Sequence, residues 1–257
     1  MISSVYKING MDIIDMKSII HNIFCAFVLA GCAGGTIGPL NELQAIDSEY
    51  SIAFWVRNTD STAPVHIYIE GDGHAFDARG RPTSDPTPRG TLVRDMAAAD
   101  MTPNVAYLAR PCQFIMSPAC SVHDWTDGRF SERIIDEMSN AVTFIARGRP
   151  VVLIGYSGGA MASALIISRN PDLNVHEWIT IAGVLNHDDW TEYFGDAPLS
   201  ESLSLHELPH VPQRHYVAPD DVVVPNSLSV RWTDGRNLIF VPGASHNDFS
   251  MLNVDKI

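Results

Sequence analysis

The segment Gly155–Gly159 (GYSGG), together with its two flanks, constrains the fold of this chain more than any other feature. The apolar run Val151–Ile154 precedes it directly, and the helix-forming stretch Ala160–Ser168 follows it. This order predicts a buried strand, a sharp turn and a helix. Small residues around Ser157 suit a turn that is too tight for larger side chains. The serine is therefore expected at the tip of the turn, in a strained backbone conformation.

Apolar runs and longer amphipathic segments alternate along the rest of the chain. Runs rich in Val, Ile and Tyr predict core strands at residues 65–70, 105–109, 150–154, 178–182, 215–218 and 237–241. Longer segments predict helices at residues 91–99, 131–147 and 160–168. Residues 51–57 predict an additional antiparallel strand near the sheet edge. The alternation predicts an α/β protein with a mostly parallel central sheet and helices on both faces.

The first part of the chain has the features of an export signal. From Met16, a short positively charged start leads into an apolar stretch that is too short to span a bilayer but fits a secretory signal. It ends in Leu29–Cys32 (LAGC), which resembles the lipobox of bacterial lipoproteins. The resemblance implies lipidation of Cys32 and cleavage before it. An ordinary signal peptide with an incidental cysteine is the alternative.

This interpretation divides the chain into a signal peptide at 1–31, a tether at 32–50 and a folded domain at 51–257. Met16 is the expected start, since the aspartates that precede it are unusual before a signal of this kind. Ala33 directly follows the cysteine expected to be lipidated, and an alanine there resembles the sorting signal of outer-membrane lipoproteins. The expected location is thus the bacterial cell envelope, with the protein facing the periplasm and bound to the membrane through its N-terminal lipid.

Two cysteines, Cys112 and Cys120, remain in the predicted domain. They do not form a zinc-binding pattern, because the chain contains no pair of Cys-x-x-Cys motifs. An oxidising periplasm favours a local disulfide between them. Two buried free thiols are the alternative.

Charge and motif context exclude two classes of partner. The formal net charge is −13 and no basic cluster offsets it, so nucleic-acid phosphates would repel the chain. Residues His206–His210 match the zinc motif H-E-x-x-H, but Pro209 disrupts the helix that would place both histidines on one face. We therefore expect no nucleic acid, no metal and no organic cofactor.

Ser157 is the candidate nucleophile. The N-terminus of the following helix would present backbone N–H groups to a developing oxyanion, while a histidine must remove the serine proton. His246 follows the last predicted strand, and Asp220 and Asp221 follow the strand before it, which gives the order serine, acid, histidine. The alternative role for Ser157 is a helix N-cap in a nucleotide-binding turn, although neither glycine pattern of such turns is present.

From about residue 51 onward the chain resembles the α/β-hydrolases. More narrowly, it resembles uncharacterised bacterial hydrolase lipoproteins that contain YIEGDG, RPCQ and GYSGG, which stand here at 68–73, 110–113 and 155–159. The resemblance implies an α/β-hydrolase fold with a short cap, and its D-x-V-V-P pattern assigns the acid to Asp221. It also implies oxyanion N–H groups from Gly158 and from Asp72 or Gly73. A carboxylate at Asp72 departs from the usual pattern, so it must point away or be paired.

Two further sets of residues each have two interpretations. Arginines of the Pro-rich loop after strand 65–70 would bind an anionic substrate or, as we favour, be solvated: Arg79, Arg81 and Arg89. Aromatic residues in the segment 185–212 would line a pocket wall or, as we favour, form the packing face of a small helix: Trp190, Tyr193 and Phe194. The shortness of this segment argues against a large mobile lid.

The predicted function is a serine hydrolase that cleaves an ester, thioester or amide of a small acyl substrate through an acyl-enzyme. Ser157 would attack the substrate, His246 would transfer the proton, and Asp221 would orient His246. The alternative is a non-catalytic binding or structural envelope lipoprotein on an inactive hydrolase fold. Retention of all three candidates at expected strand ends favours the enzyme.

Overall fold

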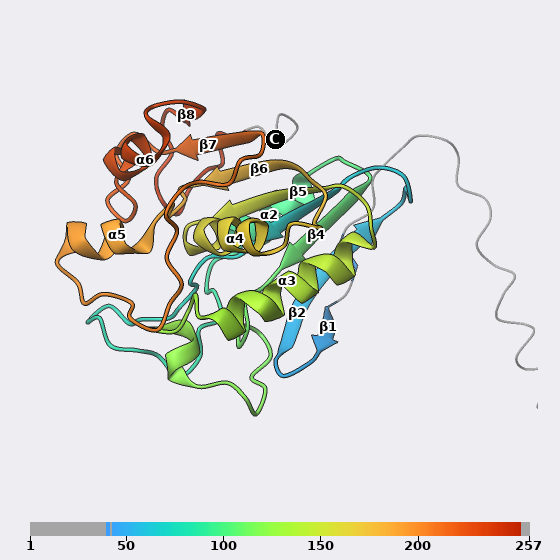
Figure 1. Cartoon of the computed structure of the whole chain (residues 1–257), viewed down its shortest axis with the longest axis horizontal. Helices are drawn as coiled ribbons and strands as arrows, with labels where there is room; N and C mark the ends of the chain where they lie inside the picture. The colour runs from blue at the N-terminus through green and yellow to red at the C-terminus, as the bar shows by residue number, and fades with distance from the viewer. Residues whose placement is uncertain (1–39, 42, 253–257) are drawn as a thin grey trace, which may run out of the picture. The chain divides into compact units, whose positions relative to one another are not determined.

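A computed structural model describes residues 40–41 and 43–252 (Figure 1). The signal peptide, the alternative start at Met16 and the lipidation site Cys32 lie outside the described residues, so they stay predictions. Among the helices of the described part, none combines the length and the apolar character that a membrane span requires.

An eight-stranded sheet forms the centre of the described part, in the order β1-β2-β4-β3-β5-β6-β7-β8. The strands are β1 (Gln44–Asp47), β2 (Ser51–Asn58), β3 (Val65–Ile69), β4 (Asn104–Leu108), β5 (Val151–Tyr156), β6 (Val175–Ile181), β7 (Gln213–Val217) and β8 (Leu238–Phe240). Strand β2 pairs antiparallel with both β1 and β4, and the other neighbouring strands are parallel. The central strands β4 and β5 are buried along their whole length, which explains their continuous apolar sequences.

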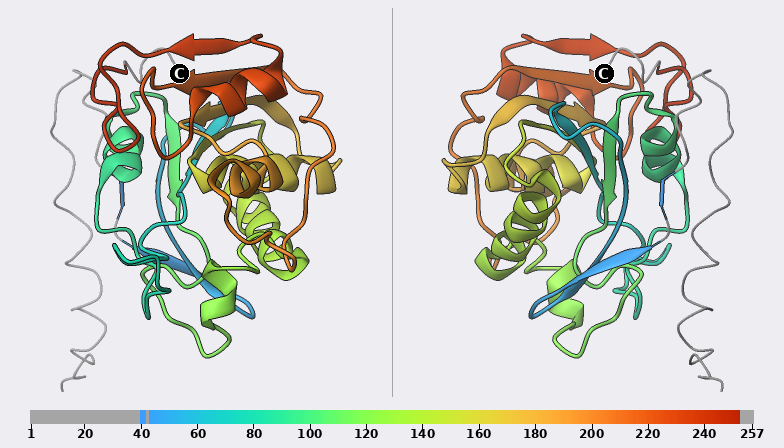
Figure 2. Two further views of the ribbon diagram at one scale, coloured as in Figure 1. Left: turned by 90° about the vertical axis from the view of Figure 1, so that its left-hand side faces the viewer. Right: turned by 90° about the vertical axis from the view of Figure 1, so that its right-hand side faces the viewer.

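Helices cover both faces of the sheet. They are α2 (Leu92–Ala99), α3 (Glu132–Ala146), α4 (Gly158–Arg169), α5 (His187–Phe194) and α6 (Asn226–Thr233), with a short 3-10 helix η1 at Val122–Trp125. Figure 2 shows α2 on one side of the strands and α3 with α4 on the other. Helix α3 buries its apolar stripe, including Ile134 and Met138, in one core, and α2 buries Val93 and Met96 in the second. The predicted α/β architecture is confirmed.

The N-terminal limit of the folded part was predicted wrongly at residue 51. Residues 44–47, assigned to the tether, form strand β1, whose Ala45 pairs with Ala53 of β2. This edge strand has mostly exposed side chains and is held by backbone pairing, so no apolar run in the sequence predicts it. Helix α6 also escaped the sequence analysis, because its sequence NSLSVRWT lacks a strong apolar stripe.

Candidate active site

Ser157 occupies the turn between β5 and α4 in a strained backbone conformation. Its φ of 51° and ψ of −123° lie in a region that residues other than glycine rarely adopt. The Ser157 N–H donates to the carbonyl of Ile181 at 3.0 Å. Its carbonyl accepts from the N–H groups of Ala160 at 3.1 Å and Val184 at 3.0 Å. These backbone bonds to neighbouring segments hold the strained turn in place.

Two glycines of the GYSGG segment permit close approaches of the backbone. A Cβ atom on Gly155 would lie 2.5 Å from the Cα atom of Ala160, so only glycine lets the strand and the helix meet here. A Cβ atom on Gly158 would lie 2.9 Å from Cγ of Asp72 and 3.2 Å from Nη1 of Arg110. Gly158 therefore lets the loop after β3 approach the start of α4.

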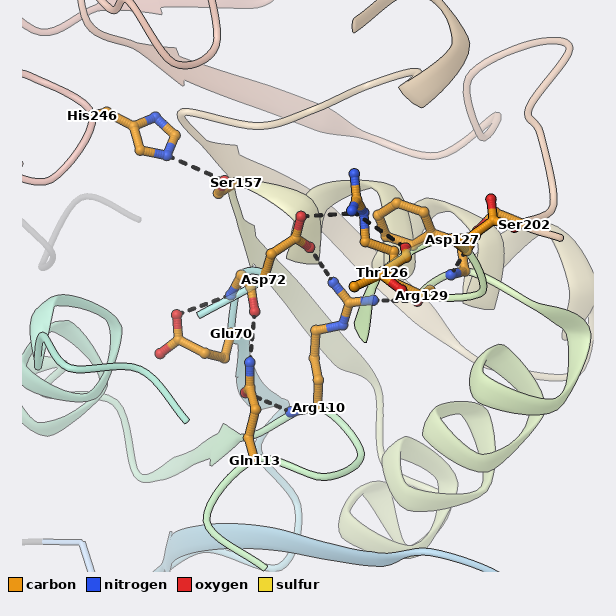
Figure 3. Close-up of polar contacts among 12 residues, drawn as sticks. Glu70, Asp72, Arg110, Gln113, Thr126, Asp127, Arg129, Ser157, Ser202 and His246 are labelled. Carbon is orange, nitrogen blue, oxygen red and sulfur yellow. Dashed lines mark hydrogen bonds and ion pairs between the residues drawn. The ribbon is translucent and has the colours of Figure 1, made fainter. Parts of the chain in front are cut away.

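His246 and Asp221 reach Ser157 from the loops that follow β8 and β7. Nε2 of His246 lies 3.2 Å from Oγ of Ser157, and Nδ1 lies 2.9 Å from Oδ2 of Asp221 (Figure 3 shows the first contact). His246 is 8% exposed and Asp221 is 7% exposed. The structure thus brings together the three residues that the sequence analysis selected, because parallel strands end at the same edge of the sheet.

The surroundings of Asp221 keep its carboxylate ionised. Burial alone would raise the pKa of this carboxyl, but the hydrogen bond from His246 and those from two backbone N–H groups lower it below its ordinary value. The N–H groups belong to Val223, at 2.8 Å, and Val224, at 2.9 Å. An ionised acceptor fixes the proton on Nδ1 of His246 and leaves Nε2 free to accept the serine proton. The neighbouring Asp220 is exposed.

Tyr156, the second residue of the GYSGG segment, supports the histidine. Its hydroxyl lies 2.9 Å from the carbonyl oxygen of His246 and 3.2 Å from Oδ1 of Asn247. The Tyr156 ring also packs against the imidazole, with centroids 5.3 Å apart. Burial raises the pKa of the Tyr156 hydroxyl, so it stays a donor at neutral pH. Nothing in the motif distinguishes the residue at this position, so the sequence gives no sign of this role.

The carboxylate of Asp72 is paired. It lies between the guanidinium groups of Arg110 and Arg129, as Figure 3 shows, with Nη1 of Arg110 at 2.5 Å and Nε of Arg129 at 3.3 Å. Of the two arrangements expected for this residue beside an oxyanion site, pairing is the one observed. Arg110 belongs to the RPCQ motif, whereas no motif points to Arg129.

Segment 110–113 also holds the loop that carries Asp72 and Gly73. Nε2 of Gln113 donates to the carbonyl of Gly71 at 2.9 Å, while its Oε1 accepts from the backbone N–H of Arg110 at 3.0 Å. Cys112 and Cys120 form a disulfide, so that prediction is confirmed. The YIEGDG and RPCQ segments are therefore in direct contact.

Glu70 lies buried beneath the same loop. Its carboxyl accepts hydrogen bonds from the backbone N–H of Gly71 at 2.9 Å and from the hydroxyl of Tyr107 at 2.8 Å. Burial raises the pKa of Glu70, although both hydrogen bonds act in the opposite direction. The sequence analysis assigned this residue no role.

Three backbone N–H groups near Ser157 have no acceptor in the part of the chain that the structure describes. They belong to Asp72, Gly73 and Gly158, the residues expected to form an oxyanion hole. Gly158 is the first residue of α4, where N–H groups lack partners within the helix and carry partial positive charge. Such groups can bind an anionic oxygen next to Ser157.

A cavity of about 710 Å³ opens beside Ser157 and His246. Its apolar lining includes Leu92, Val93, Val184, Trp190, Val223 and Val224. Its polar lining includes Glu70, Asp72, Arg89, Asp95, Arg129 and His187. Of the three aromatic residues on α5, Trp190 lines the cavity, whereas Tyr193 and Phe194 are exposed and contact one another.

The remaining candidate residues lie elsewhere. Arg79 and Arg81 are exposed, and Arg81 pairs with Asp77 at 2.6 Å, while the exposed Arg89 lies at the cavity. Residues 206–210 are irregular, as Pro209 predicts. Within residues 40–41 and 43–252, no cluster of three or more His, Cys, Asp or Glu side chains is arranged to hold a metal ion.

Known proteins resemble this chain in structure but not in sequence. No family model and no curated protein matches the sequence. Among solved structures, Est1E from Butyrivibrio proteoclasticus, bound to ferulic acid, matches with a TM-score of 0.59 and 12% identity over 81% of this chain and 93% of its own. The mouse alpha/beta hydrolase domain-containing protein 10 matches with a TM-score of 0.55 and 13% identity over 82% and 94%. This chain has the α/β-hydrolase fold.

A third solved structure shares this fold. A putative hydrolase from Agrobacterium vitis S4 matches this α/β-hydrolase fold with a TM-score of 0.54 and 13% identity, over 85% of this chain and 96% of its own. At identities this low, the likeness shows a shared α/β-hydrolase fold and gives no information on substrate or activity. The narrower resemblance to bacterial hydrolase lipoproteins stays a prediction.

Proposed function

We propose that this protein is a serine hydrolase that cleaves a carboxylic ester, thioester or amide through an acyl-enzyme. One observation carries the proposal: Oγ of Ser157, on a strained turn, lies 3.2 Å from Nε2 of His246, whose other nitrogen is bound to the buried Asp221. This is the geometry of an activated nucleophile, with a base beside it and an acid that orients the base.

Each step of the proposed reaction uses a group at the site. His246 Nε2 accepts the proton as Ser157 Oγ attacks the acyl carbon, and the resulting oxyanion is stabilised by the N–H groups of Gly158 and of Asp72 or Gly73. His246 then donates the proton to the leaving group, which departs and leaves the acyl group on Ser157. A water molecule, deprotonated by His246, attacks this acyl-enzyme, and collapse of the second intermediate releases the acid and restores Ser157.

The cavity is compatible with small acyl substrates. Its volume of about 710 Å³ lies within the usual range for small-molecule sites, and its lining combines apolar walls with a few polar groups. Carboxylic esters are the first class to test.

Labelling with a fluorophosphonate tests the proposal directly. The probe should label wild-type protein and a Ser168→Ala control, since Ser168 is exposed near the far end of α4. Ser157→Ala should not be labelled and should lose on the order of 10⁴- to 10⁶-fold in kcat on the best p-nitrophenyl ester. A folded wild-type protein that does not react would favour the non-catalytic alternative, and labelled Ser157→Ala would remove this serine from the mechanism.

A further inference from the structure

Arg129 is a buried cation in the same cavity as Ser157, and the proposed catalytic steps do not use it. It is 5% exposed. Its Nη1 donates to the carbonyl of Thr126 at 3.3 Å, and its Nε lies 3.3 Å from Asp72 without hydrogen-bond geometry, the two contacts drawn on its guanidinium in Figure 3. Among the described residues, Nη2 of Arg129 has no hydrogen-bond acceptor.

The charges around Arg129 do not balance. Asp72 is shared with Arg110, which makes the closer contact at 2.5 Å, and no other carboxylate of the described residues lies within ion-pair distance of either arginine. Glu70 also faces the cavity, but its two carboxyl oxygens accept from Gly71 and Tyr107, and it forms no ion pair with either arginine. The cluster therefore holds two positive charges against one negative charge. A surplus charge withdrawn from water is costly unless an anion joins it.

His187 lines the cavity wall next to Arg129, and its surroundings make Arg129 the better partner for an anion. The ring of His187 stacks on Phe130 at 5.7 Å, and the Arg129 guanidinium carbon lies 5.8 Å from the centroid of the same Phe130 ring. Nε2 of His187 donates to the carbonyl of Leu203 at 3.0 Å, so Nδ1 carries no proton in the neutral ring and accepts only. Burial lowers the pKa of His187, although the carboxylate of Asp188 and the hydrogen bond to Leu203 act in the opposite direction. The carboxylate of Asp188 already lies beside this nitrogen, with Oδ1 3.2 Å from Nδ1 of His187, so His187 is not open to a ligand carboxylate and Nη2 of Arg129 is the available donor.

The two other charged side chains of the cavity have less influence. Arg89 and Asp95 are both exposed, and they carry opposite charges. Water screens exposed charges, so neither side chain should select strongly for the charge of a ligand. Arg89 is therefore a matched control for Arg129: the same residue type, lining the same cavity, but solvated.

We propose that the substrate of this hydrolase carries a carboxylate that Nη2 of Arg129 binds while the scissile carbonyl lies at Ser157. The inference rests on the proposed function and narrows its substrate class to esters that carry a free carboxylate. Examples are monoesters of dicarboxylic acids and hydroxy acids that are acylated on their hydroxyl group. A buried guanidinium bound to a carboxylate forms a charge-assisted hydrogen bond, which is among the strongest polar contacts in proteins. Arg129 is in this role a specificity-determining residue.

Matched substrate pairs test the proposal. Mono-p-nitrophenyl glutarate and p-nitrophenyl pentanoate differ by a carboxylate on the acyl side. Likewise, 4-acetoxybenzoate and phenyl acetate differ by a carboxylate on the leaving group. We expect wild-type protein to prefer the anionic member of at least one pair. Arg129→Gln should lower kcat/KM for that anionic ester by about 10- to 100-fold, the usual effect of losing a charged hydrogen bond, and change the neutral ester less than about threefold.

Two control variants accompany these measurements. Arg89→Gln should keep the anionic preference, and Arg129→Lys should recover part of it because it retains the charge. In Arg129→Gln the carboxylate of Asp72 still has Arg110, so the loop after β3 should keep its position. Equal losses on the neutral and anionic esters, or no anionic preference in wild-type protein, would overturn the inference and leave the proposed function intact.

A binding measurement separates failure of the inference from failure of the proposed function. Ser157→Ala protein is titrated calorimetrically with glutarate, alone and combined with Arg129→Gln. Binding that the second substitution abolishes would support the anion site even if no ester were hydrolysed, in which case the proposed function alone would be wrong. No binding of glutarate to Ser157→Ala would count against Arg129 as a carboxylate site.

Discussion

Two adjacent carboxylates, Asp220 and Asp221, follow the same strand, and only one can serve His246. Consecutive side chains of an extended chain point to opposite sides. In the structure Asp221 is buried against His246, whereas Asp220 is exposed. The backbone N–H groups of Val223 and Val224 further fix the Asp221 carboxylate, so a single position of the chain orients the imidazole.

The two aspartates should therefore differ sharply on substitution. Asp221→Asn should lower kcat by up to about 10⁴-fold, because an amide no longer fixes the imidazole tautomer or stabilises its charged form. Asp220→Asn should cost about tenfold at most. Kinetics on one p-nitrophenyl ester, with melting temperatures close to wild type as a control, measure both. A larger effect at Asp220 would exchange the assignment, and no effect at either would mean that the acid lies elsewhere.

At the scale of elements, the loop after β4 supports the loop after β3. Arg110 pairs with Asp72, and Gln113 donates to the carbonyl of Gly71. The Cys112–Cys120 disulfide closes a loop that contains Gln113 and begins two residues after Arg110. The loop that carries the candidate oxyanion N–H groups is thus held by a neighbouring segment that is itself covalently closed.

Removal of this disulfide should lower stability. By the chain-entropy relation, a cross-link over so short a loop contributes about 2–3 kcal/mol to the free energy of unfolding. Urea unfolding of a Cys112→Ser/Cys120→Ser variant should show that loss, and wild-type protein treated with dithiothreitol should behave like the variant. Equal stabilities, or two free thiols found by mass spectrometry in oxidised protein, would contradict the prediction.

At the scale of the whole molecule, burial of histidines couples stability to pH. His215 in β7 is 1% exposed, with its Nδ1 2.9 Å from Oγ1 of Thr180 and its Nε2 3.0 Å from Oε1 of Gln213. Burial lowers the pKa of His215 from 6.5 to about 4. Between pH 6.5 and about pH 4, His215 is therefore protonated in the unfolded chain but neutral in the folded chain. Stability accordingly falls as the pH falls through this window.

The contribution of His215 to this loss should be about 2 kcal/mol between pH 7.5 and 5. Urea unfolding followed by circular dichroism at both pH values gives the difference in free energy of unfolding. His215→Gln should have a smaller difference between the two pH values than wild type, even though the variant is less stable overall. His210→Gln, at an exposed histidine, should leave the difference unchanged. A pH dependence of His215→Gln equal to wild type would refute the assignment.

Local patterns predicted the fold class and the candidate nucleophile of this protein. Buried parallel strands need continuous apolar sequences, and the strained turn at Ser157 needs small neighbours, so both leave signals within a few residues. Chain order and the rule that parallel strands end at one edge then predicted His246 and the pair Asp220 and Asp221, and the resemblance to α/β-hydrolases favoured Asp221. The edge strand β1 left no such signal, because backbone pairing with β2 holds it in place.

Tertiary structure alone decided which charges meet at the site. Asp72, Arg110 and Arg129 come from three different loops and become neighbours only when those loops pack around the start of α4. The energy of an ion pair depends on distance and on exclusion of water, and neither follows from sequence spacing. Position in the sequence therefore favours the arginines that follow a predicted strand, Arg79, Arg81 and Arg89, and gives no sign of Arg129. Only burial inside the folded molecule distinguishes a cation that lacks its own counter-ion from one that water solvates.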